Sequence, residues 1–294
     1  MKWCSKWFLF IRERFNPLSY SIMISFFFTA HYSLYINFAS EESESVLSLL
    51  HALPIFFALF FFFFSLRLFD EVKDLKHDIQ YYPERPLPKG ELSKNEVLHM
   101  AFVMMVLELV IFSFYGLWSI LCSLCVVIYS VFMYKEFFIS EWLHSRLTTY
   151  AVTHTFVIAI MSITVFTALL GTSPTEIPRD LVYFSLANWF IFSLFEFGRK
   201  TFLTGEERAG VKSYSKIFGK DGAVLLVLLT ASMSVFLVEQ ILPLVGLKIL
   251  SVSLLILAVC GFLYSRFDQI ILARTFRFLT TSYIVFIYGI ILVT

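Results

Sequence analysis

Nine segments of about twenty mostly apolar residues constrain the fold of this chain more than any other feature. Each is long enough to cross the hydrocarbon core of a bilayer as a helix, and none alternates apolar and polar residues as a barrel strand does. We place the spans at residues 17–39, 47–69, 97–115, 118–136, 150–171, 181–197, 222–240, 246–264 and 277–294, with a tight hairpin at Gly116-Leu117. The sequence therefore predicts an all-α polytopic membrane protein, a bundle of nine transmembrane helices forming a single domain over residues 1–294.

The composition agrees with a membrane protein. Of the 294 residues, 59% are hydrophobic and only 15% are charged, whereas a soluble domain carries roughly a quarter charged residues. The 36 phenylalanines leave too little polar surface to coat a water-soluble globule. These values exclude soluble enzymes, disordered tails and basic nucleic-acid-binding proteins.

The basic residues indicate which ends of the spans share a side of the membrane. The nine-span division puts 21 of the 23 Lys and Arg residues on the side of the N-terminus, and leaves only Arg179 and Lys248 on the other. Cytoplasmic loops carry such an excess. We therefore expect an integral protein of a bacterial inner membrane, with its N-terminus and its two long polar loops, at about 70–96 and 198–221, in the cytoplasm.

The first long loop begins with a row of acids. If the second helix continues past residue 69, then Asp70, Asp74 and Asp78 form one stripe that rises about 12 Å, with Glu71 beside it. Like charges at this spacing repel, so a solvated helix gains nothing from them. Carboxylates in an incomplete cage are the usual protein ligands of Mg²⁺ that is held jointly with substrate phosphates. The stripe therefore predicts a Mg²⁺ site.

Two cations follow the acids in a turn that prolines stiffen. Arg85 and Lys89 lie among Pro83, Pro86 and Pro88, and their side chains could reach a diphosphate bound at the acids. The alternative is a solvated helix beside the membrane whose lysines contact anionic lipid headgroups. Both interpretations place this loop at a membrane surface.

Residues 67–90 resemble the first aspartate-rich motif of the UbiA superfamily of intramembrane prenyltransferases, Asn-Asp-x-x-Asp-x-x-x-Asp followed by Arg-Pro-Leu-Pro-x-Gly. The motif positions here are Asp70, Glu71, Asp74 and Asp78, and the stretch from Arg85 to Gly90 matches the second element fully. Asp replaces Asn and Glu replaces Asp at the first two positions, which keeps the oxygen ligands and adds charge. The resemblance implies that Asp70, Asp74 and Asp78 are catalytic metal ligands, that Glu71 is a further ligand, and that Arg85 and Lys89 bind diphosphate.

The loop after the sixth span resembles the family's second aspartate-rich motif less closely. Gly210-Val211-Lys212-Ser213 and Phe218-Gly219 resemble its later elements, and Glu206 stands where one of its acids belongs. The partner position four residues earlier is Phe202, which cannot bind metal. Glu207 and Glu196 are the candidates to replace it.

By the family pattern, Glu206 is catalytic, and the acids of this second loop hold another Mg²⁺ on the same diphosphate. Arg199, Lys200 and Lys212 would assist by binding phosphate. Without the resemblance the loop is simply basic, and a phosphate-facing role competes evenly with anchoring to lipid headgroups.

Buried polar residues admit two interpretations. Glu108 lies mid-span in the third segment, where an ionised acid is costly, so it should face the bundle interior or be protonated. It either makes a structural hydrogen bond to another helix or lies near the acceptor substrate, and the same holds for His31, His154 and Asn188. Near the end of the fourth span, Tyr129 and Lys135 resemble a Tyr/Lys pair of the family, six residues apart rather than four. The resemblance makes Lys135 a candidate diphosphate contact.

The resemblance implies a Mg²⁺-dependent transferase that moves an isoprenyl chain from a prenyl diphosphate to an aromatic, quinone-type or lipid acceptor. Its expected partners are those substrates and membrane lipid, with no nucleic acid. A terpene cyclase or diphosphate lyase on the same scaffold keeps the ionisation and drops the acceptor. A transporter whose acids bind a translocated cation is the third alternative, but transporters place such sites near the bilayer midplane, and these acids lie at the cytoplasmic ends of the spans.

Overall fold

Helices make up the fold. The computed structural model describes residues 3–41, 46–207, 210 and 212–293. Within these ranges no β-strand occurs, and nine helices, one of them interrupted, are long and apolar enough to cross a membrane. This confirms the predicted all-α bundle with nine transmembrane spans.

The helices group into two compact units, and each is described by itself. Unit 1 comprises Met1–Phe138 and Thr167–Pro174. Unit 2 comprises Ile139–Phe166 and Thr175–Thr294. The first predicted polar loop belongs to unit 1, and the second belongs to unit 2.

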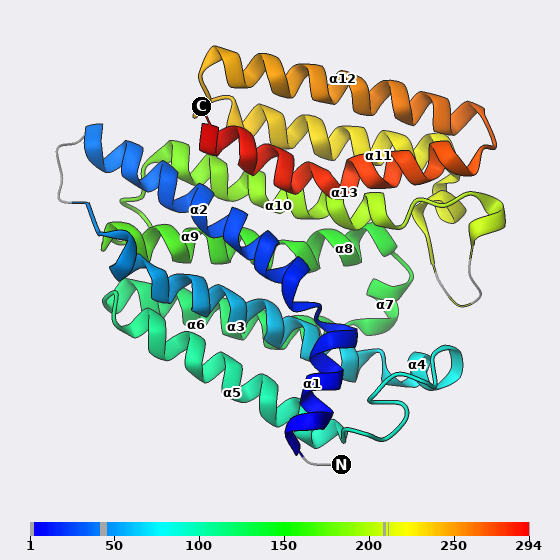
Figure 1. Ribbon diagram of the computed structural model, residues 1–294, viewed down its shortest axis with the longest axis horizontal. Helices are drawn as coiled ribbons and strands as arrows, with labels where there is room; N and C mark the ends of the chain where they lie inside the picture. The colour runs from blue at the N-terminus through cyan, green and yellow to red at the C-terminus, as the bar shows by residue number, and fades with distance from the viewer. Residues whose placement is uncertain (1–2, 42–45, 208–209, 211, 294) are drawn as a thin grey trace. The chain divides into compact units, whose positions relative to one another are not determined.

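Unit 1 is built around α3 (Leu49–Lys73). This helix packs along α5 (Lys94–Ser113) and also contacts α2 (Pro17–Glu41) and α6 (Leu117–Tyr134), as Figure 1 shows. The short helix α1 (Trp3–Arg14) precedes α2, and the rings of Phe10 and Phe15 lie 6.4 and 4.9 Å from that of Phe64 on α3. All three rings are buried, so aromatic packing attaches α1 to the central helix.

Local sequence sets the ends of α5 and α6. Ser93 caps α5, because its hydroxyl accepts from the backbone N–H of Glu96, and the Glu96 carboxylate accepts from the N–H of Ser93 at 2.7 Å. Gly116 joins the two helices with a φ of 101°, a conformation that favours glycine. The hairpin predicted between the third and fourth spans is therefore confirmed.

Unit 2 is built around α10 (Arg179–Arg199). This helix contacts α8 (Leu147–Thr155), α11 (Tyr214–Val238) and α13 (Ile270–Val293), while α12 (Leu244–Arg266) packs on α11 and α13 (Figure 1). The short α7 (Ser140–His144) precedes α8, and α9 (Val157–Leu170) runs from unit 2 into unit 1. Small residues permit close packing here, since Gly198 of α10 lies directly against Thr280 of α13.

The fifth predicted span is interrupted between α8 and α9 at Phe156. The indole Nε1 of Trp189 on α10 donates to the carbonyl of Val152 at 2.8 Å, one turn before the interruption. A side chain that bonds a helix carbonyl competes with the regular helical pattern and accompanies such kinks. The kink is thus supported by a neighbouring helix of the same unit.

Two spans begin about two helical turns earlier than predicted. The seventh starts at Tyr214 rather than 222, and the ninth starts at Ile270 rather than 277. Basic residues such as Lys216 and Lys220 lie in the first turns, so hydropathy excludes these turns although the backbone is already helical. Gly219, with a φ of 72°, kinks α11 within its polar turn.

Candidate active site

The acidic stripe at the end of α3 keeps the predicted helical spacing. The helix ends at Lys73, and a short helix α4 (Leu75–Tyr81) starts directly after Asp74. The N–H of Asp74 donates to the carbonyl of Asp70, and the N–H of Asp78 donates to that of Asp74, each at 2.9 Å. The helical hydrogen-bond ladder therefore passes through the break, and the three aspartates stay one turn apart.

The three aspartates differ in their partners. Asp70 accepts from the Lys73 ammonium at 2.9 Å, and the buried Asp78 accepts from the Arg85 guanidinium at 2.7 Å. Asp74, between them, makes no salt bridge or side-chain hydrogen bond in the part of the chain that the structure describes. The middle carboxylate of the stripe is thus left available for an added cation.

The environment of Asp74 disfavours the charged form of its side chain. Desolvation by the surrounding protein, followed by repulsion from Asp70 and Asp78, raises the pKa of Asp74 above the ordinary value, although its side chain still reaches solvent. No three acidic, histidine or cysteine side chains converge on a metal position in the described ranges. Magnesium commonly takes one or two protein carboxylates and completes its shell with water and substrate phosphate, so Asp74 with Asp70 fits a shared site.

The cationic turn after the stripe is compact. The N–H of Lys89 donates to the carbonyl of Arg85, and Gly90, with a φ of 79°, closes the turn by donating to the carbonyl of Leu87. The guanidinium of Arg85 lies 3.9 Å from the ring centroid of Tyr82 while it contacts Asp78. The structure therefore brings Arg85 into contact with the acidic stripe.

Lys89 has a more open environment than Arg85. Its ammonium contacts Glu91 at 2.6 Å, and this hydrogen bond and charge raise the pKa of Lys89. Its side chain remains largely exposed, so the charge is accessible to an anionic ligand. Arg85 and Lys89, the two cations of this turn, belong to unit 1, as the acidic stripe does.

Glu71 has a different environment from the stripe. Its side chain is buried, and Oε1 accepts from Arg14 Nε at 2.8 Å and from Arg67. Its other oxygen, Oε2, is buried without a hydrogen bond in the described part of the chain. Arg14 ends α1 and Arg67 lies one turn earlier on α3, so Glu71 fixes the segment that carries the stripe. Its role as a metal ligand stays a prediction, and its contacts support a positioning role.

Replacing Glu71 with glutamine should destabilise unit 1. Two guanidinium groups would lose a shared charge and keep only a neutral acceptor, which should lower the free energy of unfolding by about 1–2 kcal/mol. The measurement is thermal unfolding in detergent. Glu13→Gln is the matched control, because Glu13 is exposed and lies 3.9 Å from Arg12, and it should change stability by less than about 0.5 kcal/mol. Equal effects of the two substitutions would contradict the positioning role.

Lys135 follows α6 at an unusual backbone turn. The next three residues, Glu136, Phe137 and Phe138, have φ values of 50°, 51° and 60°, a left-handed conformation that costs about 1–2 kcal/mol per non-glycine residue. Ring contacts of Phe137 with Tyr129 and of Phe138 with Phe132 oppose this cost. A left-handed turn of three consecutive non-glycine residues could not be predicted from the sequence.

The same region places Lys135 close to the stripe. Its ammonium lies 5.0 Å from the ring centroid of Tyr134, and that ring stacks on Phe69 at 4.9 Å. Phe69 directly precedes Asp70, so the end of α6 lies beside the end of α3. The predicted role of Lys135 as a diphosphate contact remains a prediction with this proximity in its favour.

In unit 2, Glu206 is held by an arginine that the sequence did not indicate. Both carboxylate oxygens accept from Arg277, at 2.6 and 2.8 Å, and Arg277 also donates to the carbonyl of Thr201 at 2.9 Å. The guanidinium carbon lies 5.1 Å from the ring centroid of Phe202, the residue that replaces the family's acid. The hydrogen bonds from Arg277 are the main reason that the pKa of Glu206 lies below its ordinary value.

The other acids of the second loop also have close partners. Glu196 accepts from Arg199 at 2.5 Å and from Lys200 at 2.6 Å. Glu207 Oε1 accepts from the hydroxyls of Ser213 at 2.5 Å and Ser215 at 3.1 Å.

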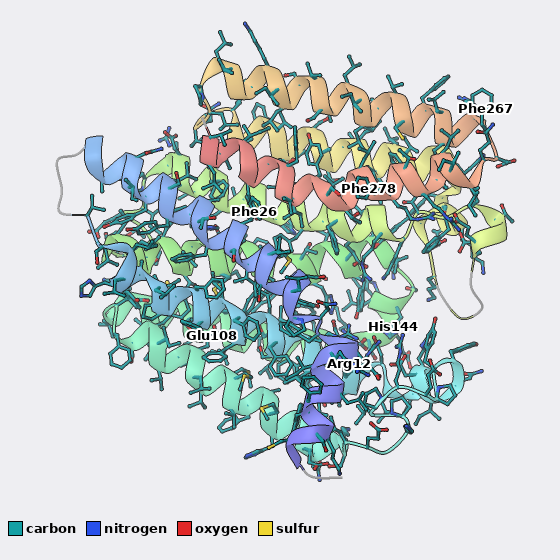
Figure 2. All side chains as sticks on the ribbon, in the orientation of Figure 1. Arg12, Phe26, Glu108, His144, Phe267 and Phe278 are labelled. Atoms are coloured by element: carbon teal, nitrogen blue, oxygen red, sulfur yellow. The ribbon has the colours of Figure 1, made fainter. Side chains whose placement is uncertain are left out.

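Lys212 donates to a neighbouring backbone. Its ammonium bonds the carbonyl of His144, labelled in Figure 2, at 2.7 Å. Arg199 and Lys212 are both exposed enough to meet an anion, while Val211 between the matched glycine and lysine lies outside the described residues. Arg199 and Lys212, the predicted cations of the second loop, both belong to unit 2.

The Glu206–Arg277 pair predicts a stability that depends on pH. Since the folded pKa of Glu206 is depressed, its contribution is complete above the ordinary glutamate pKa of about 4.3 and is lost as the pH falls through the lower folded value. Glu206→Gln should therefore cost about 1 kcal/mol at pH 7 and progressively less below the ordinary pKa. Thermal unfolding of both proteins over that pH range measures the difference. A difference that grows on acidification would contradict the assignment.

The buried acid Glu108 faces the interior of unit 1, as the sequence predicts. Figure 2 labels it on α5, and Ser123 of α6 donates to its Oε1 at 3.1 Å. Both side chains are buried. The contact supports the structural interpretation, and a role near the acceptor stays a prediction.

The remaining buried polar residues make contacts within their own units. Asn188 accepts from the Tyr288 hydroxyl at 2.7 Å and donates to Ser162 at 3.1 Å, so it belongs to a buried network of unit 2. The Nδ1 atoms of His31 and His154 each lie 2.7 Å from the backbone carbonyl four residues earlier. Satisfied buried polar groups of this kind favour the structural interpretation for Asn188 and His31, whereas His154 is only half-buried.

This chain is similar to known proteins in sequence and in structure. A sequence profile of the UbiA prenyltransferase family matches residues 21–290. The structure resembles that of digeranylgeranylglyceryl phosphate synthase in membranes, at 17% identity and a TM-score of 0.65, over 100% of this chain and 97% of the other. It also resembles a UbiA homologue from Aeropyrum pernix K1, at 16% identity and a TM-score of 0.63, over 94% and 98% of the two chains. No curated protein sequence gives a significant match.

A third solved structure, of a UbiA homologue from Archaeoglobus fulgidus bound to GPP and Mg²⁺, is similar at 15% identity and a TM-score of 0.54, over 97% and 99% of the chains. The nine membrane-length helices in the described ranges define an integral membrane protein. Since the profile covers nearly the whole sequence, the chain belongs to the UbiA prenyltransferase family. It is an integral membrane transferase of prenyl groups.

Proposed function

We propose that this chain is a Mg²⁺-dependent intramembrane prenyltransferase that moves an isoprenyl group from a prenyl diphosphate to an aromatic, quinone-type or lipid acceptor. The observation that carries the proposal is the carboxylate of Asp74, which has no ionic partner among the described residues and lies between two paired aspartates. The Archaeoglobus fulgidus homologues, solved with GPP or DMAPP and Mg²⁺, support the donor and the metal. The digeranylgeranylglyceryl phosphate synthase likeness supports a lipid acceptor as one of the classes.

The residues of unit 1 would bind the donor's diphosphate. Asp70, Asp74 and Asp78 would hold Mg²⁺, which when bound neutralises charge on the departing diphosphate. Arg85 and Lys89 would bind the phosphate oxygens directly, and Lys135, next to the Tyr134 ring that stacks on Phe69, would join them. We propose that Arg199 and Lys212 of unit 2 also bind phosphate.

The reaction breaks the allylic C–O bond, and diphosphate leaves with the bonding electrons. Cationic side chains around the leaving group lower the energy of this charge separation. The acceptor's nucleophilic atom then forms the new bond to the allylic carbon, and the proton it carried is lost to a base. Aromatic side chains such as the stacked Phe69 and Tyr134 could stabilise the transient positive charge. We propose that residues 1–294 act together as one enzymatic domain.

Mass spectrometry of products tests this function. The purified protein would receive prenyl diphosphates of several chain lengths with Mg²⁺, with and without an extract of membrane lipids and quinone precursors. A prenylated acceptor that forms only when the extract is present supports transfer. Release of diphosphate with a hydrocarbon product from the donor alone would instead identify a cyclase or lyase, and no consumption of any donor would contradict both.

We propose that the site faces the cytoplasm of a bacterium and that the protein lies in the inner membrane. The excess of basic residues on the side of the N-terminus supports this orientation. Cysteine labelling tests it in a variant that lacks the four native cysteines. A membrane-impermeant maleimide applied to intact cells should react with Thr172→Cys and not with Glu84→Cys, and the opposite pattern would reverse the orientation.

A further inference from the structure

The acids of unit 2 differ from Asp74 in the charge that surrounds them. Glu206 is bonded by both terminal nitrogens of Arg277, and Arg274 Nε lies 3.9 Å from the same carboxylate. Glu196 is bonded by Arg199 and Lys200. Each of these carboxylates therefore faces two cations, and the local charge is positive before any ligand binds.

A positive surrounding opposes a divalent cation and favours an anion. A metal ion placed on Glu206 would have to displace Arg277 from two hydrogen bonds and would then lie beside the displaced guanidinium. Asp74 has no such obstacle, since its side chain has no ionic partner among the described residues and its nearest charged neighbours include two aspartates. Glu206 and Glu196 thus differ from Asp74, because each of them already lies beside two cations.

A phenylalanine replaces the acid that the family's second motif has four residues before Glu206. Phe202 stands four residues before Glu206, and its ring lies under the guanidinium of Arg277. Its N–H donates to Ser215 Oγ at 2.8 Å, and its carbonyl accepts from the hydroxyl of Tyr264 at 2.8 Å. The residue that could have been a metal ligand instead helps to hold an arginine.

Glu207 is the remaining oxygen donor to be considered. One oxygen is held by Ser213 and Ser215, and the other, Oε2, is buried without a hydrogen bond in the described ranges. No group of three possible metal ligands forms around it in those ranges. A second metal ion in unit 2 would depend on this single oxygen, which makes Glu207 the decisive position for a test.

We propose that this chain binds one Mg²⁺ with its diphosphate substrate, through the acids of unit 1, and that unit 2 holds no second Mg²⁺ because cations already pair with Glu206 and Glu196. This inference rests on the proposed function. It assigns Glu206 as the residue that positions Arg277 and Glu196 as the residue that positions Lys200 and Arg199. The expected metal site is therefore a single Mg²⁺ in unit 1.

Counting bound metal tests the inference without measuring turnover. Mn²⁺ serves as the probe for Mg²⁺, and its binding is followed by electron paramagnetic resonance. The protein is saturated with geranyl thiolodiphosphate, a donor analogue that resists ionisation. The wild-type chain should then bind one Mn²⁺. Asp74→Asn should bind none, whereas Glu206→Gln and Glu207→Gln should each still bind one. Two ions per wild-type chain, with one lost in either glutamine variant, would overturn the inference and leave the proposed function intact. No Mn²⁺ binding by the wild-type chain would overturn both.

Discussion

Asp74→Asn is expected to lower the rate of prenyl transfer by about a thousandfold at saturating donor and Mg²⁺. The substitution keeps the size and one oxygen of the side chain but removes the charge that a divalent cation requires. The measurement is the initial rate of product formation, followed by mass spectrometry, over a titration of Mg²⁺. Asp268→Asn is the matched control, because Asp268 is exposed and its one described partner is Lys220, and it should leave the rate within about twofold.

The stability of the same variant separates catalysis from folding. Asp74 has no salt bridge or side-chain hydrogen bond in the described ranges, and its neighbours Asp70 and Asp78 repel its charge. Asp74→Asn should therefore unfold at the same temperature as the wild-type protein or slightly above it. A rate within tenfold of the wild type, or a rate loss that accompanies a comparable loss of stability, would contradict the role assigned to Asp74.

Gly198→Ala is expected to destabilise unit 2 by about 2–3 kcal/mol, although alanine is the better helix former. A Cβ atom at this position would lie 2.1 Å from Thr280 Oγ1 and 2.4 Å from Thr280 Cβ. Real contacts of this kind do not occur, so α10 and α13 would have to separate. The measurement is thermal unfolding in detergent, with the rate of transfer as a second readout because Glu196 and Arg199 flank this contact.

Gly289→Ala provides the same substitution in the same unit without the clash. Among the described residues, no atom beyond its chain neighbours and the helix's own nearby backbone lies within 4 Å of the position that its Cβ would take on α13, so the change should be neutral or stabilising by up to about 1 kcal/mol. Adding Thr280→Gly to Gly198→Ala should recover stability, whereas Thr280→Ala should recover less because its Cβ remains. Equal effects of the two glycine substitutions would show that close packing of α10 on α13 does not constrain the unit.

Hydropathy predicted the spans well because each needs only a run of apolar residues. Hydropathy did not predict the earlier starts of α11 and α13, because Lys216 and Arg274 lie on turns that are helical but polar. The spacing of Asp70, Asp74 and Asp78 was predictable for a similar reason, because the backbone pattern that sets it is local.

The partners of the acids were predictable only where they are local. Arg67 lies four residues before Glu71, so their contact follows from helical spacing. Arg277 lies 71 residues after Glu206, and neither residue type nor spacing indicates that they meet. Which carboxylates are already paired with arginine depends on tertiary packing, and the sequence alone therefore does not indicate it.

The contact of Arg14 with Glu71 has a consequence for how unit 1 loses structure. Two contacts attach helix α1 to α3. One is the packing of the buried rings of Phe10 and Phe15 on Phe64, and the other is the ion pair of Arg14 with Glu71. A helix held by two such contacts unfolds together with the helix that it packs on, rather than fraying on its own. The first helix and the aspartate-bearing end of α3 should thus form one cooperative unit, so trimming the N-terminus would loosen the predicted metal ligands more than fifty residues away.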